Sequence, residues 1–576
     1  MIADIRHSNP TGKKFSIFAT SLFKGGMGAL FLYIAAQITS PYDRIPTMKT
    51  WMKKYIALIL ALVVISGVCF LFSGRKEGMF IDEIYTFGLS NSYYAPYITD
   101  IKGGDLIDKV VTRQELFDYL SVGDNDRFAA GSVYYNQTRD VHPPLYYWLL
   151  NFVSSLVPGH FSMWIGLALN YGLYMLTLVL LYKLAMLLFE SRLNAVCTVL
   201  LYGLSVIGLS TMLMIRMYVL ITLLSVLLAY LIARLMREKK PVLYVLVGVT
   251  VFAGLMTQYY FVFYAFFVCL AYDIRALVKK DWRGFAAFSA AALIGALCLL
   301  PAFPACLDQL FADALVSGGN AVDNLMSFGQ YKARLGIFIA DTRHRMKAVI
   351  YIALAAVVCA LICFRRIRAA AKAQSIRLDA LVLILPAVLS FVLIAVISPV
   401  SEIRYIYNLI PMLVLAVSLL LHVIEASLPD GALNRRAAVI AGALVGALCL
   451  WEARCLPPDY LYDEYSDYDA MLEQHSAAPC VYVDDNYFSP ITFDMMQLMI
   501  FDDFLVTNDT ASAAMLSYIG DAPETVVFID ISGEWASGYD AGEVVAGLEA
   551  STGYTEATEL YSNGFSAVYV LKGGNA

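Results

Sequence analysis

Two neighbouring carboxylates stand at the start of a long polar segment in an otherwise apolar sequence. Asp82 and Glu83 follow the apolar run 55–72, and His142 with two prolines ends the segment where the next apolar run begins. An ionisable pair at the end of a membrane-spanning run lies at the membrane surface, where it is a candidate for function. A carboxylate placed there can take a proton from a hydroxyl group. The alternative is that both acids are solvated charges that end a helix.

Two arginines interrupt the later apolar runs. Arg216 separates the runs 193–215 and 218–236, and Arg404 precedes the run 405–425. Lone arginines at the ends of spans are often anchors that reach toward the membrane surface. The arrangement of basic clusters along the chain places both arginines at the outer ends of their spans. Positive charge is disfavoured on the outer side, so two such arginines there indicate an anionic partner. A phosphate fits, because a guanidinium binds it through two parallel hydrogen bonds.

Composition places the chain among the polytopic membrane proteins. Its 576 residues are 60% hydrophobic and 15% charged, and the mean hydropathy is +0.66, which is too apolar for a soluble globular protein. The net charge of −6 argues against a nucleic-acid-binding surface. The ten cysteines include no CxxC pair and are read as small buried hydrophobic residues, with Cys455 and Cys480 as the one candidate disulfide.

Apolar runs of roughly twenty residues predict about eleven spans. They are 55–72, 161–182, 193–215, 218–236, 241–257, 259–278, 284–300, 348–364, 378–397, 405–425 and 437–451. Basic clusters lie on alternate connections and mark the inside, which places the loops 73–142 and 301–347 and the residues after 455 outside. The shorter run 145–157 is predicted to be re-entrant or interfacial, with a short span as the alternative.

The sequence divides into three parts. Residues 1–47 are an extension of doubtful status, because Met48 has the basic flank and apolar run of a natural start. Residues 48–453 are predicted to form the membrane domain, which carries the candidate catalytic residues. Residues 454–576 are predicted to be a small α/β domain outside the membrane. Its expected strands are 480–484, 525–530 and 566–571, and its expected helices are 493–505 and 541–550. The loop 301–347 is interpreted as a lid or an ordinary connector.

The motifs together resemble the GT-C glycosyltransferases of the family 39 type, which include the protein O-mannosyltransferases and the lipid A aminoarabinose transferases. The residues that carry the resemblance are Asp82-Glu83, His142-Pro143-Pro144-Leu145-Tyr146-Tyr147, Arg216-Met217-Tyr218, Gln258-Tyr259-Tyr260 and Arg404-Tyr405 with Pro411. The resemblance covers roughly residues 50–425. Two departures leave donor sugar and acceptor open. The aminoarabinose transferases have Lys-Pro where this chain has His142-Pro143, and the mannosyltransferases lack the C-terminal domain.

The resemblance implies an inverting transfer of a sugar from a polyprenyl phosphate to a lipid, glycan or protein acceptor at the outer face of a plasma membrane, with a bacterial membrane expected. In this reading Asp82 is the general base and Glu83 its partner, while Arg404, Arg216 and Tyr405 bind the donor phosphate. The supporting residues are His142, Tyr146, Tyr218, Gln258 and Tyr259. No metal is required by this chemistry, although acids near a phosphate could hold a divalent cation.

The rival function is a flippase or transporter for lipid-linked sugars. Transporters place ionisable residues near the middle of the membrane and are built from internal repeats. Here the charges gather at the outer ends of the predicted spans, and the sequence contains no evident repeat. A purely structural or sensory membrane protein would leave the motifs without a role. The sequence therefore favours the enzyme.

Overall fold

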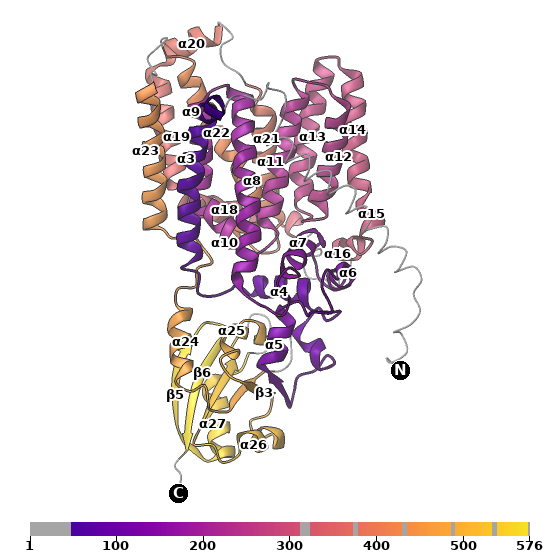
Figure 1. The fold of residues 1–576 in the computed structure, drawn as a ribbon, viewed down its shortest axis with the longest axis vertical. Helices are drawn as coiled ribbons and strands as arrows, with labels where there is room; N and C mark the ends of the chain where they lie inside the picture. The colour runs from indigo at the N-terminus through magenta and orange to yellow at the C-terminus, as the bar shows by residue number, and fades with distance from the viewer. Residues whose placement is uncertain are drawn as a thin grey trace. The chain divides into compact units, whose positions relative to one another are not determined.

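The computed structural model describes residues 48–311, 323–372, 378–428, 435–484, 490–532 and 538–573. It consists mostly of helices, together with one six-stranded sheet (Figure 1). The chain forms two compact units. Within the described ranges, the first comprises residues 48–74, 140–146 and 167–459, and the second comprises residues 75–139, 147–166 and 460–573. The expected extension 1–47 lies outside the described residues.

The first unit is helical. Its longer elements are α3 (Met48–Ser73), α8 (Met163–Phe189), α9 (Arg192–Gly203), α10 (Val206–Leu213), α11 (Tyr218–Leu235), α12 (Pro241–Leu255), α13 (Phe261–Val278), α14 (Trp282–Leu297), α18 (Tyr331–Arg345), α19 (Lys347–Ile362), α20 (Phe364–Lys372), α21 (Leu381–Ile397), α22 (Ile410–Glu425) and α23 (Arg435–Cys455). Short elements join them: α15 (Leu299–Ala302), α16 (Cys306–Phe311), η4 (Phe328–Gln330) and η5 (Ile403–Leu409).

Helix α11 is the core of this unit. Every residue from Tyr218 to Ala233 is buried, and α12, α13 and η5 pack around the helix. A helix that is apolar on all sides is buried in protein or faces lipid. It tolerates both surroundings because its backbone groups form hydrogen bonds within the helix. Helices α12 and α14 approach closely through glycines, since a methyl group on Gly295 would lie only 2.1 Å from the carbonyl oxygen of Gly248.

The prediction of a mostly helical protein with many apolar helices of membrane-spanning length is confirmed. Within the described residues, seven helices are long and apolar enough to cross a membrane, and two bent helix pairs raise this to nine. The number eleven stays a prediction. The run 193–215 is not one straight helix, because α9 and α10 meet at 59°. Ser205 causes this break by capping α10, since its side chain accepts a hydrogen bond from the backbone N–H of Gly208 at 3.1 Å.

The second unit contains the sheet. Its strands are β1 (Lys109–Thr112), β2 (Cys480–Val483), β3 (Asp503–Thr507), β4 (Glu524–Asp530), β5 (Tyr554–Ser562) and β6 (Ser566–Gly573). Its helical elements are α4 (Ile81–Asn91), η3 (Ile98–Lys102), α5 (Arg113–Leu120), α6 (Ala130–Gln137), α7 (Leu145–Ser154, which begins in the first unit), α24 (Tyr465–Glu473), η6 (Pro490–Thr492), α25 (Met495–Leu498), α26 (Ala513–Ile519) and α27 (Ala541–Thr552).

The sheet joins the first loop to the C-terminal residues. Its strand order is β1-β3-β2-β4-β6-β5, in which β2 runs parallel to β3 and β4. Strand β1 comes from the loop 73–142 and pairs antiparallel with β3, with Lys109 opposite Val506. Alternate residues such as Val481, Val527 and Ile529 form the core beneath α26 and α27. The predicted small C-terminal sheet is therefore present and includes a strand from the loop.

Several local predictions need correction. The expected helix 493–505 is short, since only α25 is helical there and β3 takes up its last residues. The loop 301–347 contains the helix α18, which we did not expect. The candidate disulfide is wrong, because Cys455 and Cys480 are both free and Cys480 is buried in β2. The short run 145–157 needs no correction. It forms the ten-residue helix α7, which is too short to cross a bilayer, and a re-entrant or interfacial position stays the prediction for it.

Candidate active site

The predicted carboxylates lie in the first turn of α4. Asp82 and Glu83 follow the extended residue Phe80, so negative charge stands at the positive end of the helix dipole. The carboxylate of Glu83 accepts the backbone N–H of Phe80 at 2.7 Å. Glu83 is buried, whereas Asp82 is only half-buried. The fold thus uses Glu83 to cap the helix and leaves Asp82 more accessible.

A lysine that the sequence reading missed neutralises Glu83. The ammonium of Lys76 lies 3.0 Å from Glu83 Oε2, and both side chains are fully buried. Lys76 also donates to the carbonyl oxygen of Tyr460 at 2.7 Å and lies 5.4 Å from the ring centre of Tyr462. Burial lowers the pKa of Lys76, although Glu83 opposes this shift.

His142 and Arg216 come together in the first unit. Arg216 lies in the break between α10 and α11 and is buried, and its guanidinium approaches His142 Nδ1 at 3.5 Å. The same ring nitrogen lies 3.1 Å from the carboxylate of Asp140. Burial alone would raise the pKa of Asp140, but His142 and Arg216 hold it below its usual value. Asp140 is therefore ionised at neutral pH. These three residues form the Arg216 cluster.

A chain of hydrogen bonds links Tyr259 to the Arg216 cluster. The Tyr259 hydroxyl donates to Gln309 Oε1 at 2.5 Å, and Gln309 Nε2 donates to the backbone carbonyl of Asp140 at 2.7 Å. Tyr259 and the buried Gln258 lie in the short connection between α12 and α13. The interrupted helices thus bring polar residues together inside an apolar unit.

Arg404 and Tyr405 lie in η5, which packs against α11. Arg404 Nε is 2.7 Å from the carboxylate of Glu402, and its guanidinium carbon is 5.8 Å from the Tyr405 ring centre. Tyr405 contacts Tyr260 edge-on at 5.3 Å. Tyr218, at the start of α11, contacts Tyr407 of η5 edge-on at 5.9 Å. These aromatic contacts join the segment of Arg404 to the segments of Arg216 and Tyr259.

Tyr146 braces the break that holds Arg216. Its hydroxyl donates to Asn170 Oδ1 at 2.7 Å. The amide of Asn170 in turn donates to the backbone carbonyls of Met212 and Met214, at 3.0 and 2.6 Å. The Met214 carbonyl also accepts the backbone N–H of Arg216 at 2.8 Å. The Met212 carbonyl lies where α10 ends, and the amide supplies it with a partner that a buried carbonyl needs. Tyr146 therefore acts on Arg216 through Asn170.

The predicted residues fall into two groups, one in each unit, and each group is described by itself. The first unit brings His142, Arg216 and Tyr259 into one hydrogen-bonded chain, while the second holds Asp82 and Glu83. The sequence reading missed Lys76 and Asp140. A basic residue just before the two acids, on the side where bases are disfavoured, was a usable signal for Lys76. Asp140 stands two residues before His142, whereas nothing local pointed to Gln309.

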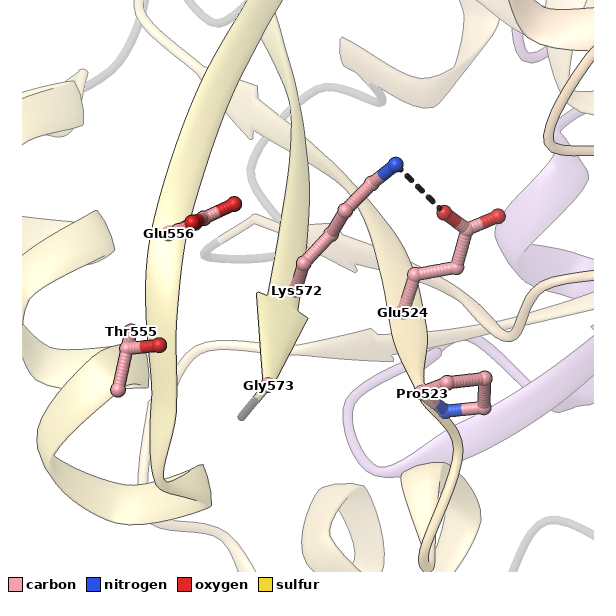
Figure 2. A pocket seen from close by; sticks show the side chains of 6 residues that line it. All are labelled: Pro523, Glu524, Thr555, Glu556, Lys572 and Gly573. Carbon is pink, nitrogen blue, oxygen red and sulfur yellow. Dashed lines mark ion pairs between the residues drawn. The ribbon is translucent and has the colours of Figure 1, made fainter. Parts of the chain in front are cut away.

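A hollow on the sheet of the second unit is a weaker candidate site. It lies at the ends of β4, β5 and β6, and Figure 2 shows Lys572 pointing toward Glu524 across it. Lys572 Nζ is 3.3 Å from Glu524, which also pairs with His475 at 3.0 Å. Glu524, Lys572 and His475 therefore pair with one another. In the part of the chain that the structure describes, no three His, Cys, Asp or Glu side chains are grouped to bind a metal.

Residues 141–306 match the family described as dolichyl-phosphate-mannose-protein mannosyltransferase. The matched segment begins one residue before His142 and includes Tyr146, Arg216, Tyr218 and Tyr259. The predicted resemblance to the GT-C glycosyltransferases is confirmed. No curated protein sequence matches the chain.

Several solved structures align along most of the chain. ArnT from Cupriavidus metallidurans bound to undecaprenyl phosphate is 11% identical, with 90% of this chain and 98% of that chain covered and a TM-score of 0.47. Its apo form gives 11% identity, coverage of 89% and 97%, and a TM-score of 0.49. The archaeal oligosaccharyltransferase AglB from Archaeoglobus fulgidus, in complex with an inhibitory peptide and a dolichol-phosphate, is 11% identical. The alignment covers 90% of this chain and 74% of that chain, with a TM-score of 0.42. Residue roles are not transferred at this level of likeness.

Proposed function

We propose that this chain is a membrane glycosyltransferase that transfers a sugar from a polyprenyl-phosphate donor to an acceptor hydroxyl at the outer membrane face. The observation that carries the proposal is the Arg216 cluster, in which the guanidinium of Arg216 is buried where helices break inside an apolar unit and approaches the partly buried pair of His142 and Asp140. Buried charge of this kind is costly and is kept for function. The family match over residues 141–306 supports the same reading.

The chemistry divides between the two groups of residues. A phosphate-linked sugar already carries a good leaving group, so the enzyme must deprotonate the acceptor and stabilise the departing phosphate. Asp82 takes the proton of the acceptor hydroxyl, whose oxygen forms a bond to the anomeric carbon. The bond from this carbon to the phosphate oxygen breaks with inversion, and polyprenyl phosphate leaves. Arg404 and Arg216 stabilise its charge, with Tyr405 and His142 beside them.

The second candidate is a flippase for lipid-linked sugars. Helices broken at a buried arginine, as α10 and α11 are at Arg216, also occur at the binding sites of transporters. The two functions differ in one chemical event. A glycosyltransferase cleaves the bond between sugar and phosphate, whereas a flippase moves the intact lipid across the bilayer. An assay of bond cleavage in a sealed bilayer therefore distinguishes them.

The Arg404→Lys variant is expected to bind a polyprenyl-phosphate sugar about tenfold more weakly, a loss of about 1.4 kcal/mol. Lysine keeps the positive charge but lacks the planar fork that binds phosphate through two hydrogen bonds. Donor affinity measured in nanodiscs tests this expectation. Arg283→Lys is the matched control, because Arg283 is exposed on α14. Donor affinity unchanged in Arg404→Ala as well as Arg404→Lys would rule out the phosphate role.

The proposed orientation places the loops 73–142 and 301–347 and the residues after 455 on the outer side of the membrane. Single cysteines at Asn125 and Ser476, both exposed, should react with an impermeant maleimide on sealed cells when introduced into a cysteine-free variant. A cysteine at Ala369, exposed on α20 beside three arginines, should react only after permeabilisation. Labelling of Ala369→Cys in sealed cells, together with protection of Asn125→Cys, would reverse the orientation and favour a nucleotide-sugar donor.

A further inference from the structure

Helices α18 and α19 meet at a right-angled corner in the first unit. The two helices bend by 88° at Met346, so one of them can cross a bilayer while the other lies along its surface. Helix α18 has the composition of a surface helix, since Ile337 and Ile339 are exposed beside charged residues. A corner of this kind is suited to the level where lipid headgroups meet the hydrocarbon.

A hollow of about 630 Å³ opens at this corner, within the range of about 300–1,000 Å³ typical of small-molecule sites. Arg343, His344 and Lys347 line one part of it. Ile350, Tyr351 and Leu354 of α19 line the rest. The hollow thus combines basic side chains with an apolar wall. This pairing suits a ligand that has an anionic head and an apolar body.

The basic side chains of Arg343 and Lys347 do not form ion pairs with the acidic residues that the structure describes around the hollow. Asp341 also lines the hollow, but it pairs with Arg345 at 3.3 Å, and Arg345 reaches Asp459 at 2.9 Å. The buried Glu452 accepts the backbone N–H of Ala348 at 3.1 Å. Within the described ranges, neither Arg343 nor Lys347 forms an ion pair, and both side chains are exposed. Lys347 interacts electrostatically with Glu452. The charge of Arg343, and in part that of Lys347, is therefore available to an anion.

The apolar wall continues as a stripe along α19. Lys347, Tyr351, Leu354, Val358 and Leu361 follow one another at intervals of three or four residues, which places them on one face of the helix. Tyr351, Leu354, Val358 and Leu361 are 52%, 57%, 55% and 69% exposed. The opposite face, with Ala348, Val349 and Ala356, is buried. At about 1.5 Å per residue, the stripe spans about 21 Å, more than half of the hydrocarbon core.

We propose that the corner of α18 and α19 binds an anionic glycerophospholipid, whose phosphate is held by Arg343, His344 and Lys347 and whose acyl chain lies along the stripe on α19. The length of the stripe selects a lipid over a free phosphate, because a small anion would leave Tyr351 and Leu354 uncovered. This site is separate from the residues proposed for sugar transfer and does not depend on that activity.

Native mass spectrometry of the full chain tests the proposal, with dioleoyl phosphatidylglycerol and dioleoyl phosphatidylcholine as the probes. The Arg343→Gln/Lys347→Gln variant is expected to bind phosphatidylglycerol at least about fivefold more weakly than the unchanged chain, because each basic residue near a headgroup contributes to binding. Its weak binding of phosphatidylcholine should not change. Lys332→Gln/Lys279→Gln removes the same charge from two other exposed positions and should bind phosphatidylglycerol like the unchanged chain.

Location is tested with a phosphatidylglycerol that carries a photoreactive group in its acyl chain. The expected cross-links lie on the stripe 347–361. Equal phosphatidylglycerol binding by both double variants would overturn the proposal. So would displacement of the lipid by millimolar inorganic phosphate, which would indicate a plain anion site, or by an equimolar amount of polyprenyl phosphate, which would indicate a site for the donor lipid.

Discussion

Replacement of Asp82 by asparagine is expected to lower the rate of sugar transfer by about 10²–10⁴-fold, the range typical of a lost general base. Asparagine keeps the size of the side chain and removes its ability to accept a proton. Asp82 is half-buried in the first turn of α4, and its backbone carbonyl already accepts the hydroxyl of Thr86 at 2.6 Å. That contact does not need the carboxylate, so the variant should fold.

The matched control for this substitution is Asp124→Asn. Asp124 is exposed in the same loop as Asp82, and its replacement should leave the rate within about twofold, as is usual for an exposed position. Transfer is measured with purified protein at saturating donor. A normal rate in Asp82→Asn would remove Asp82 from the mechanism. Equal losses in the two variants would show a general effect of charge in the loop.

The second large effect is on stability. Lys76→Met is expected to destabilise the fold by about 3–5 kcal/mol, because it leaves the buried carboxylate of Glu83 without its cation. Lys76→Met/Glu83→Gln should recover more than half of this loss, since glutamine carries no charge and still accepts the N–H of Phe80. Urea denaturation of the purified chain, followed by the fluorescence of its tryptophans, measures the difference.

Arg75 offers a control one residue away. It pairs with Asp463 at 2.8 Å, but the two side chains are 44% and 53% exposed. Exposed pairs contribute below about 1 kcal/mol, so Arg75→Met should change stability little. If Arg75→Met and Lys76→Met cost the same, burial of the pair has no special weight. A double variant less stable than Lys76→Met alone would contradict the assigned role of the pair.

Local patterns in the sequence explain which parts of the fold could be predicted. Helices such as α11 are continuous apolar runs, and β4 is a short apolar run, so both are visible without tertiary context. The break at Ser205 was hidden, because a serine beside Gly203 hardly interrupts the average hydropathy of 193–215. Strand β3 was read as helix because its partner β1 lies almost four hundred residues earlier in the chain. No local pattern reveals such a pairing.

The candidate site was predictable to a similar degree. Residue types that bind phosphate are rare in apolar runs, which made Arg216 and Arg404 stand out. Partners that act through a second residue did not stand out. Gln309 reaches Asp140 from the distant short helix α16, and Asn170 supports the break beside Arg216 from the first third of α8. Such contacts depend on how helices pack, and the spacing of residues in the sequence does not encode that directly.

The central claim is that this protein breaks the bond between a sugar and a lipid phosphate. The most direct measurement uses sealed proteoliposomes that contain polyprenyl-phosphate-linked hexosyl and pentosyl donors and an acceptor fraction from the cell envelope. Wild-type protein should release polyprenyl phosphate in equal amount to the new glycosidic bonds formed, and Asp82→Asn should release almost none. Donor that crosses the bilayer with its sugar–phosphate bond intact, in both proteins alike, would contradict the claim and identify a flippase.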